Sequence, residues 1–179
     1  HLQEQDAEFA NRHGFSRHRP ALPLYTKADA EVALDAFVAV PFHEKRQAAK
    51  GISVEFRPAG HILGAAVVKV TAGDRTVVFS GDLGRPGTAT MVDPAVVRET
   101  DYLLIESTYG NRLHDRRDPE DALAEAITRT AGRGGTVLVP SFAVGRAQSL
   151  LFHLQHLKSQ GRIPDLPGFL DSPMAINDS

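Results

Sequence analysis

The sequence lacks cysteine entirely among its 179 residues. A disulfide framework, a thiolate zinc site and a thiol nucleophile are therefore excluded, and nothing indicates an oxidising compartment. Any metal ion must be held by His, Asp or Glu side chains. No apolar run approaches the roughly 20 residues that a membrane span requires, and the first residues are polar and acidic, unlike a signal peptide. From the sequence we expect a cytoplasmic protein without a membrane partner.

The sequence also lacks an excess of charge of either sign. Its 20 Lys and Arg residues are set against 22 Asp and Glu residues, for a formal net charge of -2. This balance argues against a protein that coats nucleic acid broadly, but it is compatible with a local phosphate-binding groove. Hydrophobic residues make up 42%, close to the globular average, which disfavours wholesale disorder. A chain of this length can bury roughly two-thirds of its unfolded surface.

The first half of the sequence predicts two helices followed by an antiparallel meander. A thin apolar stripe favours a helix over 2–12, and Thr26 is a suitable N-cap for a helix over 27–37. Alternating apolar residues from Ile52 predict a strand that Pro58 ends. Two further strands, about 65–70 and 76–80, flank a tight turn and complete the predicted meander.

The second half predicts strands alternating with helices. The continuous apolar run 102–105 is typical of a strand buried on both faces. Asp118 and Pro119 begin a helix that reaches about Ala131, and a strand over 136–139 and a helix over 145–159 follow. This order indicates a βαβ unit, so the fold class is α/β, a sandwich in which helices cover sheets.

Three polar residues directly follow predicted strands. His61, Asp82 and Glu106 each have glycines nearby, which let the backbone approach a bound group closely. In a meander the first and third strands end at the same edge, so His61 and Asp82 can converge there. An imidazole and a carboxylate suit Zn²⁺ in particular. The pattern leaves open that His61 is an ordinary buried histidine and that Asp82 is a turn residue.

Four short stretches in order along the chain carry a family resemblance. They are Ala59–Gly64, Ser80–Gly84, Glu106–Gly110 and Pro140–Gln148. Together they resemble the metallo-β-lactamase-fold RNA nucleases with a β-CASP cap, which include the nuclease subunit of the mRNA cleavage and polyadenylation machinery. The segment 169–175 is similar to a further signature of the cap. The resemblance implies part of an αββα sandwich over residues 1–110 and the start of a Rossmann-like β-CASP cap over 111–179.

The resemblance also implies roles for individual residues. His61 would be a ligand of one zinc ion, and Asp82 would bridge two. Glu106 would be the catalytic acidic residue that hydrogen-bonds a histidine of the cap. Two zinc ions would lower the pKa of a shared water and neutralise charge on the phosphate. The implied function is zinc-dependent hydrolysis of RNA phosphodiesters, endo- or exonucleolytic, with Asp82 also catalytic.

Departures from the family pattern lead to two further expectations. The His-x-His-x-Asp-His loop that supplies most ligands, and the later histidines of the cap, do not occur in these residues. We therefore expect that the first part of the nuclease domain and the rest of the cap are missing, and that this portion alone binds zinc weakly and cleaves nothing. The alternative function is a catalytically silent scaffold or RNA-binding subunit, and a homo-oligomer is compatible with the sequence. A fold relative acting on esters or lactams is disfavoured by the third and fourth stretches.

The last predicted helix carries two further candidate features. Ser141 and Arg146 lie before and at its start, where free N–H groups and the helix dipole favour phosphate. The alternative is that Ser141 caps the helix and Arg146 pairs with an acidic neighbour. His153 and His156 lie beside the predicted core stripe formed by Leu150, Leu151, Leu154 and Leu157. We interpret these histidines as surface or boundary residues and not as ligands.

Overall fold

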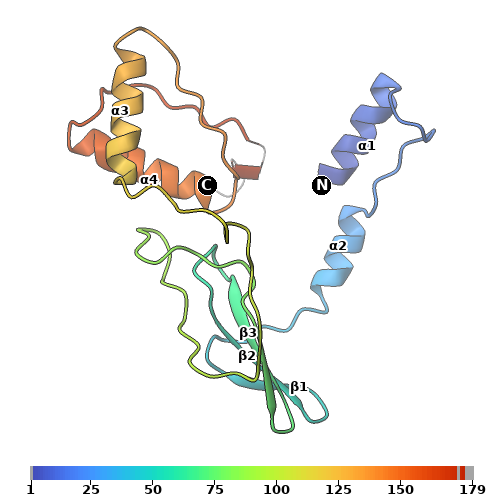
Figure 1. Cartoon of the computed structure of the whole chain (residues 1–179). Coiled ribbons are helices and arrows are strands. Elements are labelled where there is room, and N and C mark those ends of the chain that lie inside the picture. Colours follow the sequence, from blue (N-terminus) through green and yellow to red (C-terminus); the bar gives the residue numbers. More distant parts are fainter. Residues whose placement is uncertain (1, 173, 176–179) are drawn as a thin grey trace. The chain divides into compact units, whose positions relative to one another are not determined.

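The computed structural model describes residues 2–172 and 174–175, and its contacts divide the chain into two compact units, His1–Val40 and Pro41–Ser179. Unit 1 holds α1 (Leu2–His13) and α2 (Lys27–Leu34) (Figure 1). As predicted, Thr26 caps α2, and Asp29 completes a capping box. The helix ends three residues earlier than predicted, because Ala36 and Phe37 form tighter i to i−3 hydrogen bonds with Ala33 and Leu34.

Unit 2 contains a five-stranded sheet whose strands follow one another in chain order. They are β1 (Lys45–Ala49), β2 (Ile52–Pro58), β3 (Ala66–Ala72), β4 (Arg75–Phe79) and β5 (Tyr102–Leu104). The predicted meander of β2, β3 and β4 is confirmed, with Ala72 paired to Arg75 across the turn. β1 extends the sheet by one strand that was not predicted. The sequence did not indicate it, because KRQAA is exposed throughout and has no apolar alternation.

β5 forms where a strand was predicted, but it is not buried. It pairs in parallel with β4 and lies at the edge of the sheet. Tyr102, Leu103 and Leu104 are 57%, 55% and 52% exposed, so the expectation of burial on both faces is wrong. Asp101 fixes the start of this strand, because its carboxylate accepts hydrogen bonds from the Thr76 amide and from the Arg75 guanidinium, at 2.7 and 3.0 Å.

The two faces of the sheet differ in what covers them. On one face Val67 and Val78 form a small core with Ala59, and Leu83 and Val97 from the following loop pack against it. The residues paired across the strands on the opposite face are apolar, except for Arg46 of β1 and Arg75 at the start of β4. This apolar sheet face consists of Ile52, Val54, Phe56, Val68, Val70, Val77, Phe79, Tyr102 and Leu104.

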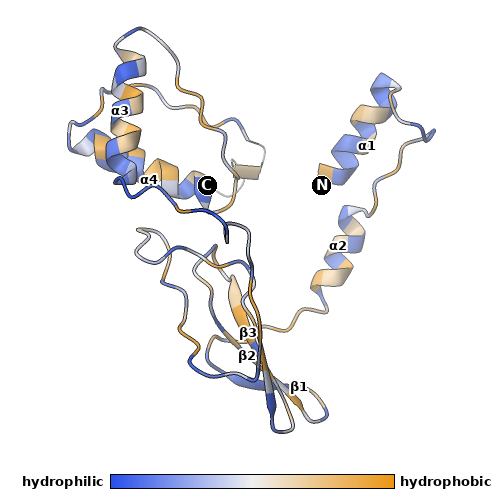
Figure 2. Cartoon of the chain, viewed as in Figure 1, coloured by the Kyte–Doolittle hydropathy of each residue, from blue (hydrophilic) through white to orange (hydrophobic). Residues whose placement is uncertain are grey.

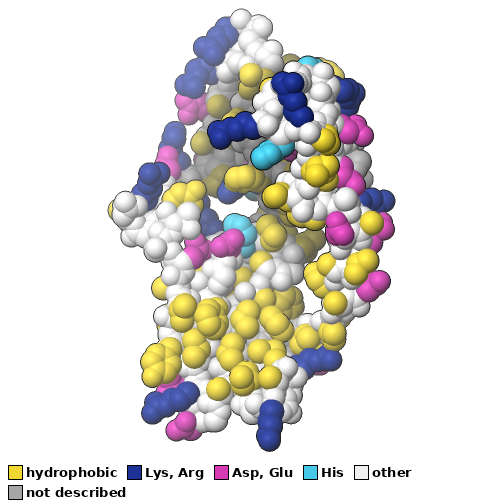
Figure 3. Space-filling model, turned by 90° about the vertical axis from the view of Figure 1, so that its right-hand side faces the viewer, with side chains coloured by type: hydrophobic (Ala, Val, Ile, Leu, Met, Phe, Trp, Pro, Cys, Tyr) yellow, Lys and Arg dark blue, Asp and Glu magenta, His cyan; other side chains and the backbone are white. Residues whose placement is uncertain are grey.

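None of the apolar sheet face is fully buried by the described residues, and hydrophobic side chains gather over the strands in Figure 3. Within unit 2, this face is therefore partly open among the described residues. The sequence pattern predicts correctly which strand positions are apolar, but it does not show what packs against them.

The remaining helices are α3 (Pro119–Ala131) and α4 (Arg146–Ser159). As predicted, Asp118 caps α3 with Pro119 at its first position, and α3 ends at Gly132. Their apolar stripes face each other (Figure 2), and the core between them contains Ala124, Ile127, Leu157 and Ile163. Leu154 packs against this core, as predicted. Leu151 was predicted to do the same, but it is 48% exposed and is not part of the core. None of the described helices combines the length and hydropathy needed to cross a bilayer.

The segment Thr136–Val139 does not form the predicted strand. All four residues are exposed and, within the described part of the chain, pair with no strand. A β-prone sequence needs a neighbouring strand to bond its backbone groups, and none lies alongside this one. The predicted βαβ unit is consequently not formed among the described residues.

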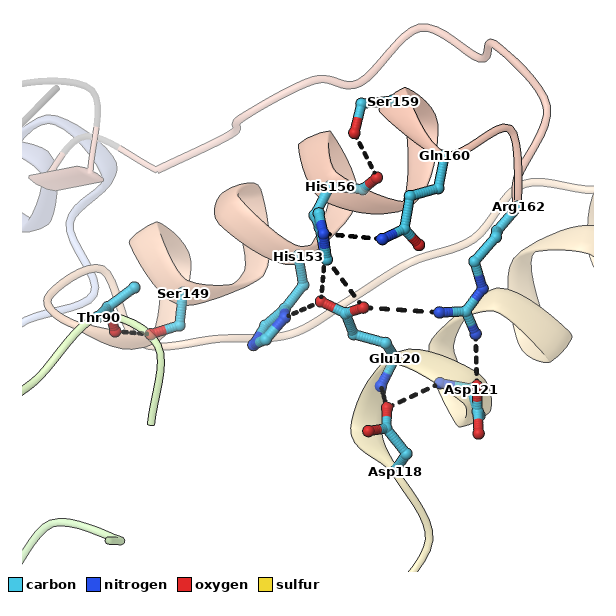
Figure 4. A network of polar contacts seen from close by, with 10 residues as sticks. All are labelled: Thr90, Asp118, Glu120, Asp121, Ser149, His153, His156, Ser159, Gln160 and Arg162. Atoms are coloured by element: carbon cyan, nitrogen blue, oxygen red, sulfur yellow. Dashed lines mark hydrogen bonds and ion pairs between the residues drawn. The ribbon is translucent and has the colours of Figure 1, made fainter. Parts of the chain in front are cut away.

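Glu120 joins α3 to α4 (Figure 4). The Nδ1 atoms of His153 and His156 lie 2.8 and 2.9 Å from its Oε1 atom, and Arg162 lies 3.6 Å from its other oxygen. An ionised carboxylate only accepts hydrogen bonds, so each Nδ1 carries a hydrogen. These bonds, the one from His153 first, hold the pKa of Glu120 below its usual value of 4.5. His153 is half-buried and His156 is exposed, so both are surface or boundary residues, as predicted.

The contacts of Glu120 predict a pH-dependent stability. Because its pKa is depressed in the folded state, the stabilisation is present above a pH of about 4.5 and is lost as the pH falls through the folded-state pKa. Glu120→Gln should lower the thermal unfolding midpoint at pH 7 and flatten its fall toward pH 3. Glu125→Gln is the matched control on the same helix, since its exposed pair with Arg129 contributes little. Equal pH slopes for the two variants would contradict the assignment.

The apolar sheet face predicts self-association of the isolated 179-residue chain. Exposed contiguous apolar surface of this size favours association. Light scattering should show a mass above that of the monomer, and replacing Phe79 and Tyr102 by Thr, which retains strand propensity, should reduce it. Lys69→Thr, on the other face, is the control and should leave the mass unchanged. A stable monomer that binds no hydrophobic dye would contradict the prediction.

Candidate functional site

The loops that follow β2 and β4 meet at one end of the sheet. The amide of Gly84 donates to the Ala59 carbonyl at 2.8 Å. A Cβ atom at Gly84 would lie 1.9 Å from the carbonyl oxygen of Gly60, so only glycine allows this approach. His61 follows Gly60 directly, and Asp82 lies two residues before Gly84. The structure therefore brings the two loops together, as the meander predicts.

Glu106, which lies two residues after the end of β5, is hydrogen-bonded to the loop that follows β4. Its Oε1 atom accepts a hydrogen bond from the amide of Leu83, and its Oε2 atom accepts one from the Thr108 hydroxyl at 2.7 Å. The Leu83 amide, then the Thr108 hydroxyl and, with a smaller effect, the charge of His61 hold the pKa of Glu106 below its usual value. Glu106 is consequently ionised at neutral pH and lies within electrostatic reach of His61.

His61 and Asp82 are both exposed at this end of the sheet. The Asp82 carboxylate makes no hydrogen bond within the described part of the chain, so its oxygen atoms are open to a ligand. An imidazole nitrogen and a carboxylate oxygen are donors that zinc accepts. Across residues 2–172 and 174–175, no three His, Asp or Glu side chains are arranged to hold a metal ion. The donor types thus fit zinc, but two residues are fewer than the about four ligands that each ion takes.

The N-terminus of α4 lies against the His61 loop. Gly145 has a φ of +76°, and a Cβ atom there would come within 2.9 Å of Ile62. The hydroxyl oxygens of Thr90 and Ser149, at the first turn of α4, are 2.8 Å apart (Figure 4). These contacts place the first turn of the helix beside the loop that carries His61.

The structure also bears on the alternative reading of Ser141 and Arg146. Gly145 is the N-cap of α4, and no side chain caps this helix, so Ser141 does not serve as the cap. Among the described residues Arg146 forms no ion pair. The structural interpretation of both residues is therefore wrong. At this end of α4 the amides of Arg146 and Ala147 donate to the carbonyls of Val144 and Phe142.

Sequence reasoning missed two residues that hold Glu106 in place. Thr108 bonds its carboxylate, and Ser80 accepts a hydrogen bond from its amide at 2.9 Å. Thr108 could have been found, because Ser and Thr hydroxyls often bond acceptors two residues away. Ser80 could not, because its contact with Glu106 depends on the parallel pairing of β4 and β5.

No family model matches the chain. It is nevertheless 37% identical to a ribonuclease of Thermus thermophilus over 155 residues, 32% to the RNase J-like protein of Methanocaldococcus jannaschii over 154, and 35% to the cleavage and polyadenylation specificity factor 73 of Drosophila melanogaster over 145. These similarities cover 86%, 84% and 80% of this chain, but only 35%, 37% and 21% of the three relatives. The chain thus spans from about a fifth to little more than a third of their length.

With the four motifs and the mixed α/β fold, these similarities define the class as proteins of the metallo-β-lactamase fold. The chain belongs to the β-CASP family of RNA nucleases within that class, as the motifs indicate.

The contact between Gly60 and Gly84 predicts that Gly84→Ala separates the two loops. A Cβ atom so close to a backbone oxygen forces the backbone to move, at a cost of about 3 kcal/mol. The thermal unfolding midpoint should fall, and the amide of Leu83 should lose its protection from hydrogen exchange. Gly168→Ala is the control, because nothing lies within 4 Å of that position. Equal stability of the two variants would contradict the close approach.

Proposed function

We propose that the intact protein containing these residues is a zinc-dependent hydrolase of RNA phosphodiester bonds. The observation that supports the proposal is that the loops carrying His61, Asp82 and Glu106 meet at one end of the sheet, within motifs of a nuclease family. The names of the relatives support RNA as the substrate, since two of them are ribonucleases or resemble one.

In this proposal His61 would hold one zinc ion, and Asp82 would be a ligand shared by two. Zinc, when bound, lowers the pKa of water and neutralises charge on phosphate oxygens. The remaining ligands come from outside the described residues, so residues 1–179 alone would bind zinc weakly and would not cleave RNA.

Glu106 acts as a fixed hydrogen-bond acceptor in the proposed mechanism. The Leu83 amide and the Thr108 hydroxyl each bond one of its two oxygen atoms, and each oxygen has a second lone pair that can accept a further hydrogen bond. A carboxylate that is ionised at neutral pH can hold and orient an imidazole. We infer that Glu106 positions a histidine that donates a proton to the leaving oxygen of the RNA.

Ser141 and Arg146 are the proposed contacts to RNA phosphate. The first turn of α4 has no side-chain cap and lies against the His61 loop. The positive end of the helix dipole attracts phosphate, and a guanidinium adds two parallel donors. Phosphates of the RNA chain next to the scissile bond would therefore contact this turn.

The proposal predicts that Asp82→Asn abolishes RNA cleavage by the intact gene product. Asn keeps the shape of the side chain but removes the charge that would bridge two cations, so kcat should fall at least about 100-fold. The bound zinc, measured by atomic emission, should fall as well, while the circular dichroism spectrum should be unchanged. Asp74→Asn is the matched control, because Asp74 lies in the β3–β4 turn at the other end of the sheet.

Two results would count against the proposal in different ways. Full activity of Asp82→Asn would remove Asp82 from the mechanism. An intact protein that binds RNA but cleaves none, with or without added zinc, would favour the catalytically silent scaffold or RNA-binding subunit instead.

A further inference from the structure

Ser80 stands out because it is a polar side chain in an apolar part of the sheet. It follows β4 directly, is only 5% exposed, and is the one polar residue among those described that is buried. A buried hydroxyl is costly unless its hydrogen bonds are made. Its partners therefore show what the fold gains from having a serine at this position.

The hydroxyl of Ser80 makes two hydrogen bonds, and each partner lies next to or within the proposed site. It donates to the carbonyl of Gly81 at 2.7 Å, in the peptide group that precedes Asp82. It accepts from the amide of Glu106 at 2.9 Å. One oxygen atom thus connects the loop that carries Asp82 with the loop that carries Glu106.

A third bond makes this connection rigid. The amide of Ser80 donates to the carbonyl of Leu104 at 2.9 Å, which continues the pairing of β4 with β5. The Ser80 backbone and side chain together hold the two strand ends in register where the loops begin. A further hydrogen bond joins the same two loops, because the Glu106 carboxylate accepts from the amide of Leu83, the residue after Asp82.

We propose that Ser80 is a positioning residue that sets the placement of Asp82 relative to Glu106. This inference rests on the proposed function, and it adds a residue that touches neither substrate nor metal. The hydroxyl serves as donor and acceptor at once, which neither alanine nor a purely accepting group can reproduce. A small misplacement of catalytic groups lowers the rate strongly, whereas substrate binding depends on other contacts.

The test compares three Ser80 variants of the intact protein. Ser80→Ala removes both bonds with little change in volume, Ser80→Thr keeps the hydroxyl, and Ser80→Cys keeps the volume with much weaker hydrogen bonding. Ser53→Ala is the matched control, since Ser53 lies on β2 at the opposite end of the same sheet. The measurements are kcat and KM for RNA cleavage, hydrogen exchange of the Glu106 amide, and the thermal unfolding midpoint.

We expect Ser80→Ala to lower kcat roughly 10- to 100-fold with KM changed less than about twofold. Exchange at the Glu106 amide should accelerate, Ser80→Thr should restore most of the rate, and Ser53→Ala should match the parent. If Ser80→Ala does not fold, Ser80→Cys should show the same split between kcat and KM.

The inference is overturned if an active parent is matched by folded Ser80→Ala or Ser80→Cys, or if exchange at Glu106 is unchanged. A variant that loses only thermal stability, with kcat intact, overturns it too, because that is the result of a merely structural role. A parent without cleavage overturns the proposed function and this inference together, so the two failures are distinguishable.

Discussion

The close approach of the Gly60 carbonyl to Gly84 is the constraint on which the candidate site depends. It brings the loop after β2 to the loop after β4, and the Gly84 amide fastens them at the Ala59 carbonyl. Only then does the Leu83 amide point at the carboxylate of Glu106. The approach of Gly60 to Gly84 and the hydrogen bond from Gly84 to Ala59 involve backbone atoms only. The reactive groups are arranged by backbone atoms that come closer than any Cβ would permit.

Local patterns in the sequence were sufficient for elements whose stabilising contacts are local. The N-cap of α3, the β3–β4 turn and the strand-end positions of His61 and Asp82 all follow from residues within a few positions of one another. The burial of β5 and the predicted strand at Thr136–Val139 were wrong, because each depends on a neighbour that no local pattern specifies. Ser80 escaped prediction for the same reason.

The carboxylates of Glu120 and Glu106 show why partners, and not residue type, indicate a role. Glu120 accepts from two histidines, a combination that resembles a ligand set in sequence, yet the bonds join α3 to α4 far along the chain from the strand ends. Glu106 has no imidazole hydrogen-bonded to it among the described residues, but backbone and hydroxyl donors fix both its oxygen atoms. The Glu120 carboxylate is therefore engaged by the two histidines, whereas the Glu106 carboxylate can still accept a hydrogen bond from an imidazole.

The parallel pairing of β5 with β4 has a consequence for the order of folding. A tight turn cannot join parallel strands, so residues 80–101 must run back along the whole sheet before β5 can dock. Closing that loop costs chain entropy that the local hairpins of the meander do not incur. Ser80 and Asp82 begin this connection and Glu106 follows its end. The strand ends that precede His61 and Asp82 can therefore be aligned by the local meander, whereas Glu106 reaches them only when β5 docks.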